Sequence, residues 1–425
     1  MTPEPAGLAQ LRLLRWLSPA VLSAALLAVA AGFGQFGAVA ALGDVAKTFG
    51  HATGGTTVSE QAGLSGTQLG LGLTVLRLAS LAALPLAGLA DRFGRRPTVL
   101  VNCAIGLALT VSAAASPGYW WFVAIFALGR PFLSATAAIA QVVAAELTAT
   151  SDRAKAVALI AGGYSLGAGI TAIVHSLAAS TLGFRGTFAL ALVPMAFLPF
   201  VSHRLVEPDR FAIVAAEPEH GLPVLGAVAP PFRRRLAIVA ALAFAVSIIT
   251  GPANSFLFLY AENVVRLSGV ATAAMVVMAG VLGLVGLLIG QWLADHWGRR
   301  PTAAVAMVAI ALCGVAAYSA ARLALVTGYV LGILCGAVFA PAAGSLANEL
   351  FPTSVRASVA GWQTTAGILG AVTGLLVFGA LVDVSNHFSL AALMTFLPPT
   401  GAALLFWLFP ETKGREPEEL WPGVP

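Results

Sequence analysis

Long apolar runs dominate this chain of 425 residues. About twelve of them come close to the ~20 residues that a helix needs to cross the hydrocarbon core of a membrane. Only 10% of the residues are charged, far below the share that is usual in a soluble domain. A segment in lipid must satisfy its own backbone hydrogen bonds, so each run is expected to form a helix, and the chain is predicted to be an all-α polytopic membrane protein. The predicted spans are residues 17–42, 64–86, 97–115, 119–143, 156–179, 184–202, 236–259, 270–292, 301–320, 323–346, 358–381 and 389–409.

One short charged motif occurs twice, after the second and the eighth span. It reads ADRFGRRPT at residues 90–98 and ADHWGRRPT at residues 294–302, and 204 residues separate the two copies. Glu146 and Arg153 follow span 4, and Glu349 and Arg356 follow span 10 at an offset of 203. A repeat at half-chain spacing predicts two pseudo-symmetric six-helix bundles, the plan of an alternating-access transporter. The predicted divisions are an N-terminal bundle at 1–202, a cytoplasmic linker at 203–235, a C-terminal bundle at 236–409 and a cytoplasmic tail at 410–425.

Basic residues are distributed unevenly over the predicted loops. With both termini in the cytoplasm, the inner loops hold 17 of the 23 Lys and Arg residues and the outer loops hold four. By the positive-inside rule, this bias predicts cytoplasmic N- and C-termini in the plasma or inner membrane of a cell. The bias also accounts for the net charge of +5, so nucleic acid is not expected as a partner. The expected partners are the lipid bilayer and a small-molecule substrate, bound by a monomer.

No cofactor chemistry is expected from this sequence. The three cysteines all lie in apolar spans, where they act as small core residues rather than disulfide partners. No cluster of His, Cys and Asp has the spacing of metal ligands, and no phosphate-binding glycine loop ends in Lys-Ser or Lys-Thr. We therefore expect neither a metal nor a nucleotide cofactor, and neither catalytic residues nor an enzyme activity.

The repeated motif resembles the Asp-Arg-x-Gly-Arg-Arg turn of the major facilitator superfamily. Residues 349–356, ELFPTSVR, resemble the Glu-to-Arg segment that follows span 10 in that family. Residues 410–414, PETKG, match the C-terminal signature of its sugar-porter branch. The chain is therefore similar to a sugar-porter or metabolite transporter over its whole length, and the resemblance implies the major facilitator fold.

Charged residues at the predicted cytoplasmic ends of the spans are candidates for a gate. Asp91 and Asp295 each end a helix, where a carboxylate can accept from the free N–H groups of a neighbouring helix. Arginines one turn further on can pair with Glu146 and Glu349. The resemblance implies that these groups hold the inner face shut, and the alternative is that the arginines only fix topology. Gln291 replaces a Gly of the family pattern, which predicts looser packing at the second copy. The candidate gate residues are Asp91, Arg95, Arg96, Glu146, Arg153, Asp295, Arg299, Arg300, Glu349 and Arg356.

Polar residues inside the spans are candidates for the cargo path, because they are costly in lipid. The ionisable ones are Arg77, Arg130 and His175, and no carboxylate lies at mid-membrane. Two buried cations predict an anionic cargo, because the planar arginine fork matches carboxylate and phosphate oxygens. Alternatively, each arginine bonds backbone carbonyls or extends toward the interface, and the histidine is a satisfied core residue. The candidate pathway residues are Gln35, Arg77, Arg130, Gln141, Tyr164, His175, Asn254 and Gln363.

The predicted function is secondary active or facilitative transport of a small polar, anionic organic metabolite by alternating access. Protons are a candidate coupling ion, although the resemblance implies an acid in span 1 where this chain has Gln35. One alternative is a proton-linked exporter of amphipathic compounds, but an exporter of cations would want a buried carboxylate. The less favoured alternative is a non-transporting membrane sensor, which would predict a large soluble appendage.

Overall fold

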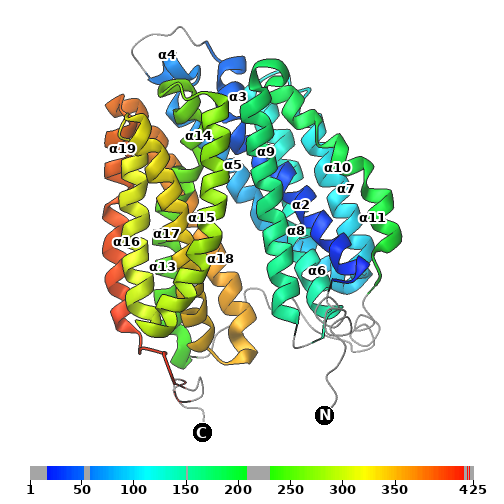
Figure 1. Cartoon of the computed structure of the whole chain (residues 1–425), viewed down its shortest axis with the longest axis vertical. Coiled ribbons are helices and arrows are strands. Elements are labelled where there is room, and N and C mark those ends of the chain that lie inside the picture. Colours follow the sequence, from blue (N-terminus) through cyan, green and yellow to red (C-terminus); the bar gives the residue numbers. More distant parts are fainter. Residues whose placement is uncertain are drawn as a thin grey trace, which may run out of the picture. The chain divides into compact units, whose positions relative to one another are not determined.

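The computed structural model describes residues 17–51, 58–149, 152–207, 230–415, 419 and 421. Within these ranges all regular elements are helical (Figure 1). Twelve of the helical segments are long and apolar enough to cross a membrane. The prediction of an all-α polytopic membrane protein is therefore confirmed.

The first half of the chain supplies six of these spans. Its elements are α2 (Pro19–Ala40), α3 (Leu42–Phe49), α4 (Val58–Ala62), α5 (Gly66–Ala79), the 3-10 turn η1 (Ser80–Ala82), α6 (Ala83–Phe93), α7 (Arg95–Ala113), α8 (Tyr119–Glu146), α9 (Arg153–Ala189), α10 (Leu192–Ala196) and α11 (Leu198–Arg204). The second span is broken by η1, and the long helix α9 changes direction at Gly183, where φ is 54°. The apolar pattern does not predict the break at η1, whereas the change of direction at Gly183 falls between the predicted spans 156–179 and 184–202.

The second half supplies the other six spans. Its elements are α13 (Pro230–Ser255), α14 (Leu257–Leu259), the π-helical segment η3 (Tyr260–Val264), α15 (Gly269–His296), α16 (Arg299–Ala317), α17 (Arg322–Glu349), α18 (Thr353–Ser385), α19 (Phe388–Phe396) and η4 (Pro398–Leu408). Helix α13 begins with Pro230, and proline suits a first turn because it lacks an N–H that would need a partner. The basic residues 233–235, expected in the linker, therefore lie in the first two turns of this helix.

Contacts divide the chain into two compact units. Unit 1 comprises residues 1–38, 79–175 and 180–220, and unit 2 comprises residues 39–78, 176–179 and 221–425. The boundary therefore falls inside three spans of the first half, and the domain divisions given by the sequence stay a prediction. In each half we call the end that carries the repeated motif the motif end, and the opposite end the far end.

In unit 1, helices α2 and α9 cross with their backbones in contact. A Cβ atom added to Gly32 would lie 2.0 Å from the carbonyl oxygen of Tyr164, so only glycine fits there. Small residues commonly permit such close crossings between membrane helices. The buried rings of Phe122 and Phe126 stack with centroids 5.9 Å apart, and Phe188 contacts both of them. These contacts hold α8 against the bend of α9.

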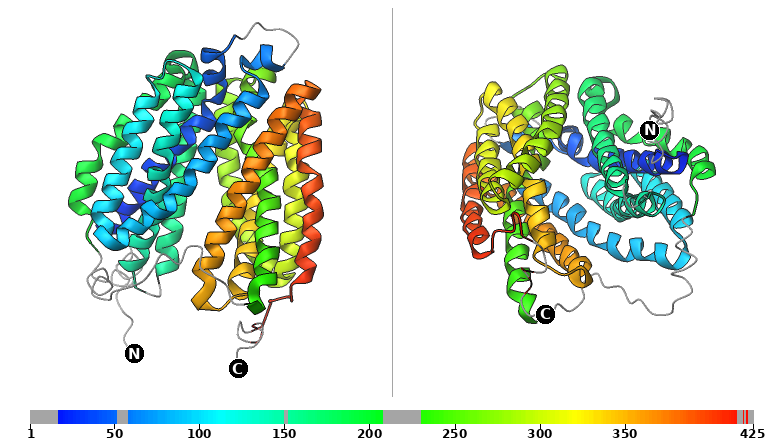
Figure 2. Two further views of the ribbon diagram at one scale, coloured as in Figure 1. Left: turned by 180° about the vertical axis from the view of Figure 1, so that it is seen from behind. Right: turned by 60° about the horizontal axis from the view of Figure 1, so that its bottom comes forward.

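In unit 2, helices α13 and α18 make a similar crossing and lie side by side in Figure 2. A Cβ on Gly370 would lie 2.1 Å from the carbonyl oxygen of Phe244. At the far end the Tyr318 hydroxyl donates to the carbonyl of Ala253 at 3.1 Å, and the Tyr260 hydroxyl donates to the carbonyl of Tyr318 at 3.2 Å. Burial, and then the neighbouring Tyr260, raise the pKa of Tyr318, so its hydroxyl remains a donor.

Candidate functional site

Both copies of the repeated motif form the same turn between two helices. Gly94 separates α6 from α7 with a φ of 97°, and Gly298 separates α15 from α16 with a φ of 113°. Glycine adopts a positive φ without the steric cost that a Cβ imposes. The turn therefore ends one helix and starts the next within a single residue, which places the Asp and the Arg pair of each motif side by side.

At the first copy, Arg95 is the centre of a charge cluster. Its side chain is 6% exposed, and its Nη2 lies 3.1 Å from Oδ1 of Asp91. Its Nε and Nη2 reach the two carboxylate oxygens of Glu146 at 3.0 and 3.1 Å. The Nη2 contact is a hydrogen bond, whereas the Nε contact is a close approach of opposite charges without hydrogen-bond geometry. Hydrogen bonds between ionised groups are among the stronger polar interactions in proteins. Arg95 thus ties the start of α7 to the ends of α6 and α8.

The second copy repeats this arrangement. Nη2 of Arg299 lies 2.8 Å from Oε1 of Glu349 and 4.0 Å from Oδ1 of Asp295. The pairs of both copies join residues of the same half, so each cluster belongs to one bundle. The distance from Arg299 to Asp295 is longer than the distance from Arg95 to Asp91. The distance from Arg299 to Glu349 is slightly shorter than the distances from Arg95 to Glu146.

Two further glutamates cap the helices that start at these turns. Glu207 accepts from the backbone N–H groups of Arg95 and Arg96 at 2.6 and 2.9 Å. Glu411 accepts from those of Arg299 and Arg300 at 2.9 and 3.2 Å. The first N–H groups of a helix lack partners within it, and the helix dipole favours an anion there. Each glutamate therefore satisfies two orphan donors of one helix.

In this structure the two helix caps are not made by Asp91 and Asp295, and the role expected for these aspartates stays a prediction. The sequence predicts that both accept from a helix N-terminus, but their described contacts go to arginine side chains. A signal for the capping glutamates was available, because 204 residues separate Glu207 from Glu411, the same offset as the repeated motif. Gln291 also differs from expectation: its side chain is exposed, and the close approach to α17 occurs at Gly290 instead.

Three of the other four candidate gate residues bind backbone carbonyls through their side chains. Arg96 donates to the carbonyl of Ser202 at 2.9 Å. Arg153 donates through Nε to the carbonyl of Ala145 in the last turn of α8, and Arg356 donates through Nε to the carbonyl of Phe351 just before α18, both at 3.0 Å. Arg300 is half-buried, and its backbone N–H is one of the two that Glu411 accepts. These arginines therefore order the connections at the motif end.

The chain after η4 is attached to the second cluster. Lys413 donates through Nζ to the carbonyl of His296 at 2.5 Å, and Trp421 donates through Nε1 to the carbonyl of Glu349 at 3.0 Å. Together with the cap by Glu411, these contacts bind the tail to the ends of α15, α16 and α17. The PETKG segment is thus an integral part of the second cluster.

Five of the candidate pathway residues lie in unit 1. Gln35 is 5% exposed and accepts from the Tyr164 hydroxyl at 3.1 Å, while its Nε2 is buried with no hydrogen-bond partner among the described residues. Arg130 is 9% exposed and donates through Nε to the hydroxyl of Ser80, in the η1 break, at 2.8 Å. His175 is fully buried, with Nδ1 2.9 Å from the hydroxyl of Thr187. Gln141, on α8, is half-buried.

The remaining three lie in unit 2. Arg77, near the end of α5, is half-buried. Asn254 donates through Nδ2 to the carbonyl of Thr250 in its own helix at 2.9 Å. Gln363 lines a cavity inside the C-terminal bundle. Among the residues that the structure describes, no group of three or more His, Cys, Asp or Glu could hold a metal ion.

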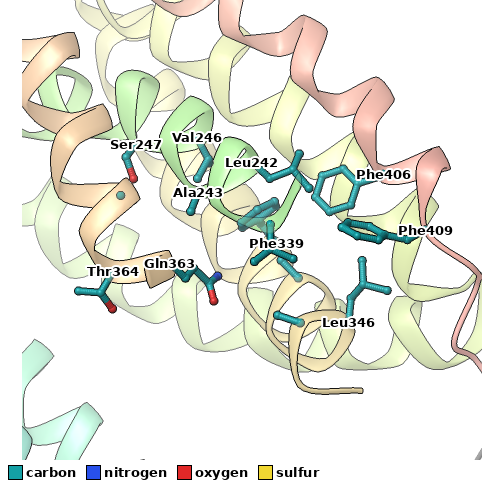
Figure 3. A pocket seen from close by; sticks show the side chains of 14 residues that line it. Leu242, Ala243, Val246, Ser247, Phe339, Leu346, Gln363, Thr364, Phe406 and Phe409 are labelled. Atoms are coloured by element: carbon teal, nitrogen blue, oxygen red, sulfur yellow. The ribbon is translucent and has the colours of Figure 1, made fainter. Parts of the chain in front are cut away.

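The cavity beside Gln363 has a volume of about 300 Å³ and lies between α13, α17, α18 and η4. Figure 3 shows the Gln363 amide directed toward the phenyl ring of Phe339, with Phe406 and Phe409 beyond it. The hydroxyl of Ser247 lies on the α13 side. A few polar groups within apolar walls are typical of small-molecule sites, and this volume is at the small end of their range.

Comparison with known proteins identifies the chain at the level of family. The family profile described as Major Facilitator Superfamily matches residues 24–323 and 284–423. The chain is 24% identical over 373 residues to a probable 4-methylmuconolactone transporter of Cupriavidus pinatubonensis, covering 83% of this chain and 84% of that protein. It is 23% identical over 372 residues to a gallate transporter of Pseudomonas putida, covering 80% and 82%.

A solved structure shows the same fold. The xylose transporter XylE from E. coli, in an inward-open conformation, matches with a TM-score of 0.71 and 18% identity. The match covers 94% of this chain and 98% of that one. The likeness therefore extends over nearly the whole length of both chains.

Proposed function

Because this chain belongs to the major facilitator superfamily of membrane transporters, we propose that its cargo is a small organic anion, carried by alternating access. The observation that carries the proposal is Arg130, a cation that is only 9% exposed inside a span. A guanidinium at that depth is costly, and its planar fork suits carboxylate or phosphate oxygens. In the described spans, by contrast, each acidic residue lies within a few residues of a helix end.

Two relatives support an organic metabolite as cargo. They are named for the transport of gallate and of 4-methylmuconolactone, both small organic compounds, and the first is a carboxylate. The cavity in unit 2 offers a matching surface, because the Gln363 amide can hydrogen-bond a polar substituent while the phenyl rings contact a flat apolar one. Gln35 adds a buried amide donor in unit 1.

We further propose that the motif end is the cytoplasmic end and that its two clusters form the inner gate. The positive-inside bias supports this orientation, with both termini inside and the chain in the plasma or inner membrane. Within each half, the Arg–Glu pairs and the capping glutamates already hold several helix ends together. Helix ends that are joined in this way could move together when the contacts with the other half form or break.

A thermal-shift screen of the purified protein tests the cargo class. Sugars, organic acids, organic phosphates and cationic drugs are each added at several concentrations. Organic acids or phosphates are expected to raise the unfolding temperature further with each increase in concentration, because a ligand that binds only the folded state stabilises it by an amount that grows with the logarithm of its concentration above Kd. Stabilisation by cationic drugs alone would show that the anion proposal is wrong and would favour the exporter.

We also propose that transport is coupled to protons, and uptake measurements test this coupling. Uptake of the identified solute into vesicles is measured with and without an imposed pH gradient. Greater accumulation with the interior alkaline is expected for proton symport. Identical accumulation under both conditions would exclude a proton drive and leave a facilitative carrier.

A further inference from the structure

At the far end of unit 2, one carboxylate of the second half caps a helix of the first half. Asp383 lies in the last turn of α18, and its Oδ1 accepts from the backbone N–H of Gly66 at 2.6 Å. Its Oδ2 accepts from the backbone N–H of Thr67 at 2.8 Å and from the Thr67 hydroxyl at 2.5 Å. All three donors belong to the first turn of α5. The contact therefore joins residues that are more than 300 positions apart in the sequence.

This arrangement makes a strong contact from few groups. The N–H groups of a helix's first turn have no partner inside the helix, and the helix dipole places positive charge beside them. Hydrogen bonds to an ionised acceptor are stronger than those between neutral groups. Asp383 gains three of them at once, so separating α5 from α18 would leave both the carboxylate and the N–H groups to be resolvated.

The two helices also touch through their backbones at this point. A Cβ on Gly379 would lie 2.3 Å from the carbonyl oxygen of Gly66, and one on Gly70 would lie 2.7 Å from that of Leu375. These glycines bring the end of α18 directly against the start of α5. The position of Asp383 is therefore set by close packing as well as by its own hydrogen bonds.

A second far-end crossing has the same backbone contact without a carboxylate that caps the helix, although Glu262 accepts from the Ser176 hydroxyl there at 3.4 Å. Gly269 starts α15 as Gly66 starts α5, and 203 residues separate them, which is the offset of the internal repeat. A Cβ on Gly269 would lie 1.8 Å from the carbonyl oxygen of Ser176 in α9. The residue that corresponds to Asp383 by this offset is Ser180. The two halves thus share the close crossing, but only one of them places an acid at the matching position.

We propose that Asp383 is a latch that holds α5 and α18 together while the far end is closed and that releases them in each transport cycle. The proposal rests on the proposed function, because a latch has a role only in a carrier that opens at both faces. Hydrogen bonds that exist in one conformation alone shift the equilibrium toward it by their own free energy. Asp383 is in this sense a positioning residue that sets turnover without touching cargo.

Distance measurements between spin labels on the two helices test the latch. Cys103, Cys313 and Cys335 are first replaced by alanine, and labels are placed at Leu71 on α5 and Val377 on α18, whose side chains are 40% and 41% exposed. The full chain is measured in lipid nanodiscs without cargo, as wild type and as Asp383→Asn. The neutral variant is expected to raise the ratio of long to short distances roughly tenfold, the effect of losing about one charge-assisted hydrogen bond.

Three further variants separate the latch from a general loss of structure. Thr67→Val removes one donor and should shift the distances in the same direction by a smaller factor, whereas Asp383→Glu should restore much of the short population. Thr373→Val is the matched control, because this threonine lies on the same helix α18 but bonds the carbonyl of Leu369 in its own helix.

Unchanged distances in a folded Asp383→Asn protein, or an equal shift in Thr373→Val, would overturn the latch. The measurement needs no cargo, so a distance shift would support the latch even if no organic anion binds. Binding of organic acids together with unchanged distances would refute the latch alone and leave the cargo proposal standing.

Discussion

At the scale of single residues, a carboxylate placed against a helix N-terminus recurs in the described part of the chain. Glu207 and Glu411 each bind two backbone N–H groups within one half, and Asp383 binds two between halves. The same chemistry therefore fixes one bundle end internally and joins two segments elsewhere. Glu207 and Glu411 cap helices of their own half, so each cap and its helix can move as one body. Asp383 caps a helix of the other half, so under our proposal this cap and its helix separate.

Neutralising an internal cap should cost stability. Glu411→Gln keeps an acceptor oxygen but removes the charge that the helix dipole favours, so we expect a loss of about 1 kcal/mol in the free energy of unfolding. The measurement is denaturant unfolding in mixed micelles. Lys155→Gln is the control, because it removes one charge from the surface pair of Lys155 with Asp152 at 2.8 Å, and such pairs contribute about 0–1 kcal/mol. An equal loss in both variants would contradict the capping role.

Arg130 and Asp91 should affect transport in different ways. Arg130→Ala removes the buried guanidinium and is expected to abolish the thermal shift caused by the cargo. Asp91→Asn changes a side chain that is 66% exposed at the motif turn, so it should leave that shift largely intact while slowing uptake. Thermal shifts and vesicle uptake are measured on the same preparations. Equal loss of binding in both variants would refute this separation of binding from gating.

At the scale of helices, the packing depends on a few backbone contacts that no other residue permits. Gly290→Ala on α15 would place a Cβ 2.5 Å from the carbonyl oxygen of Val338 on α17. Overpacking of this kind typically costs about 1–3 kcal/mol, so a clearly lower unfolding temperature is expected. Gly280→Ala on the same helix is the control, because a Cβ there meets nothing within 4 Å. Helix propensity favours alanine over glycine at both sites, so a similar loss at both would contradict an effect specific to the crossing.

The helices themselves could be predicted from the sequence, because an apolar run of about 20 residues indicates a span, and a span in lipid must satisfy its own backbone hydrogen bonds. The break at Ser80–Ala82 could not, since it contains neither glycine nor proline and its Ser80 hydroxyl accepts a hydrogen bond from Arg130, 50 positions away. The same limit applies to Asp383. The sequence places Asp383 near the end of a predicted span. Its partners Gly66 and Thr67 lie in the other half of the chain, and an apolar pattern does not show which spans pack together.

At the scale of the whole molecule, the positive-inside bias gives an orientation that can be tested directly. Ser319 lies at the far end and Lys155 at the motif end, and both residues are exposed. The variants Ser319→Cys and Lys155→Cys are each made in a background without the three native cysteines. A membrane-impermeant maleimide added to intact cells should label the first and not the second, with both labelled after lysis. The opposite pattern would invert the proposed topology and place the motif clusters outside.

The attachment of the tail has a practical consequence for protein engineering. Shortening the chain at Phe409 to aid crystallisation would remove Glu411 and leave the first N–H groups of α16 uncapped. It would also remove the indole that binds the end of α17. An affinity tag should therefore follow Trp421 through a spacer. A truncated protein that purifies well could still transport at a different rate from the full chain, because its second cluster would lack the contacts of Glu411 and Trp421.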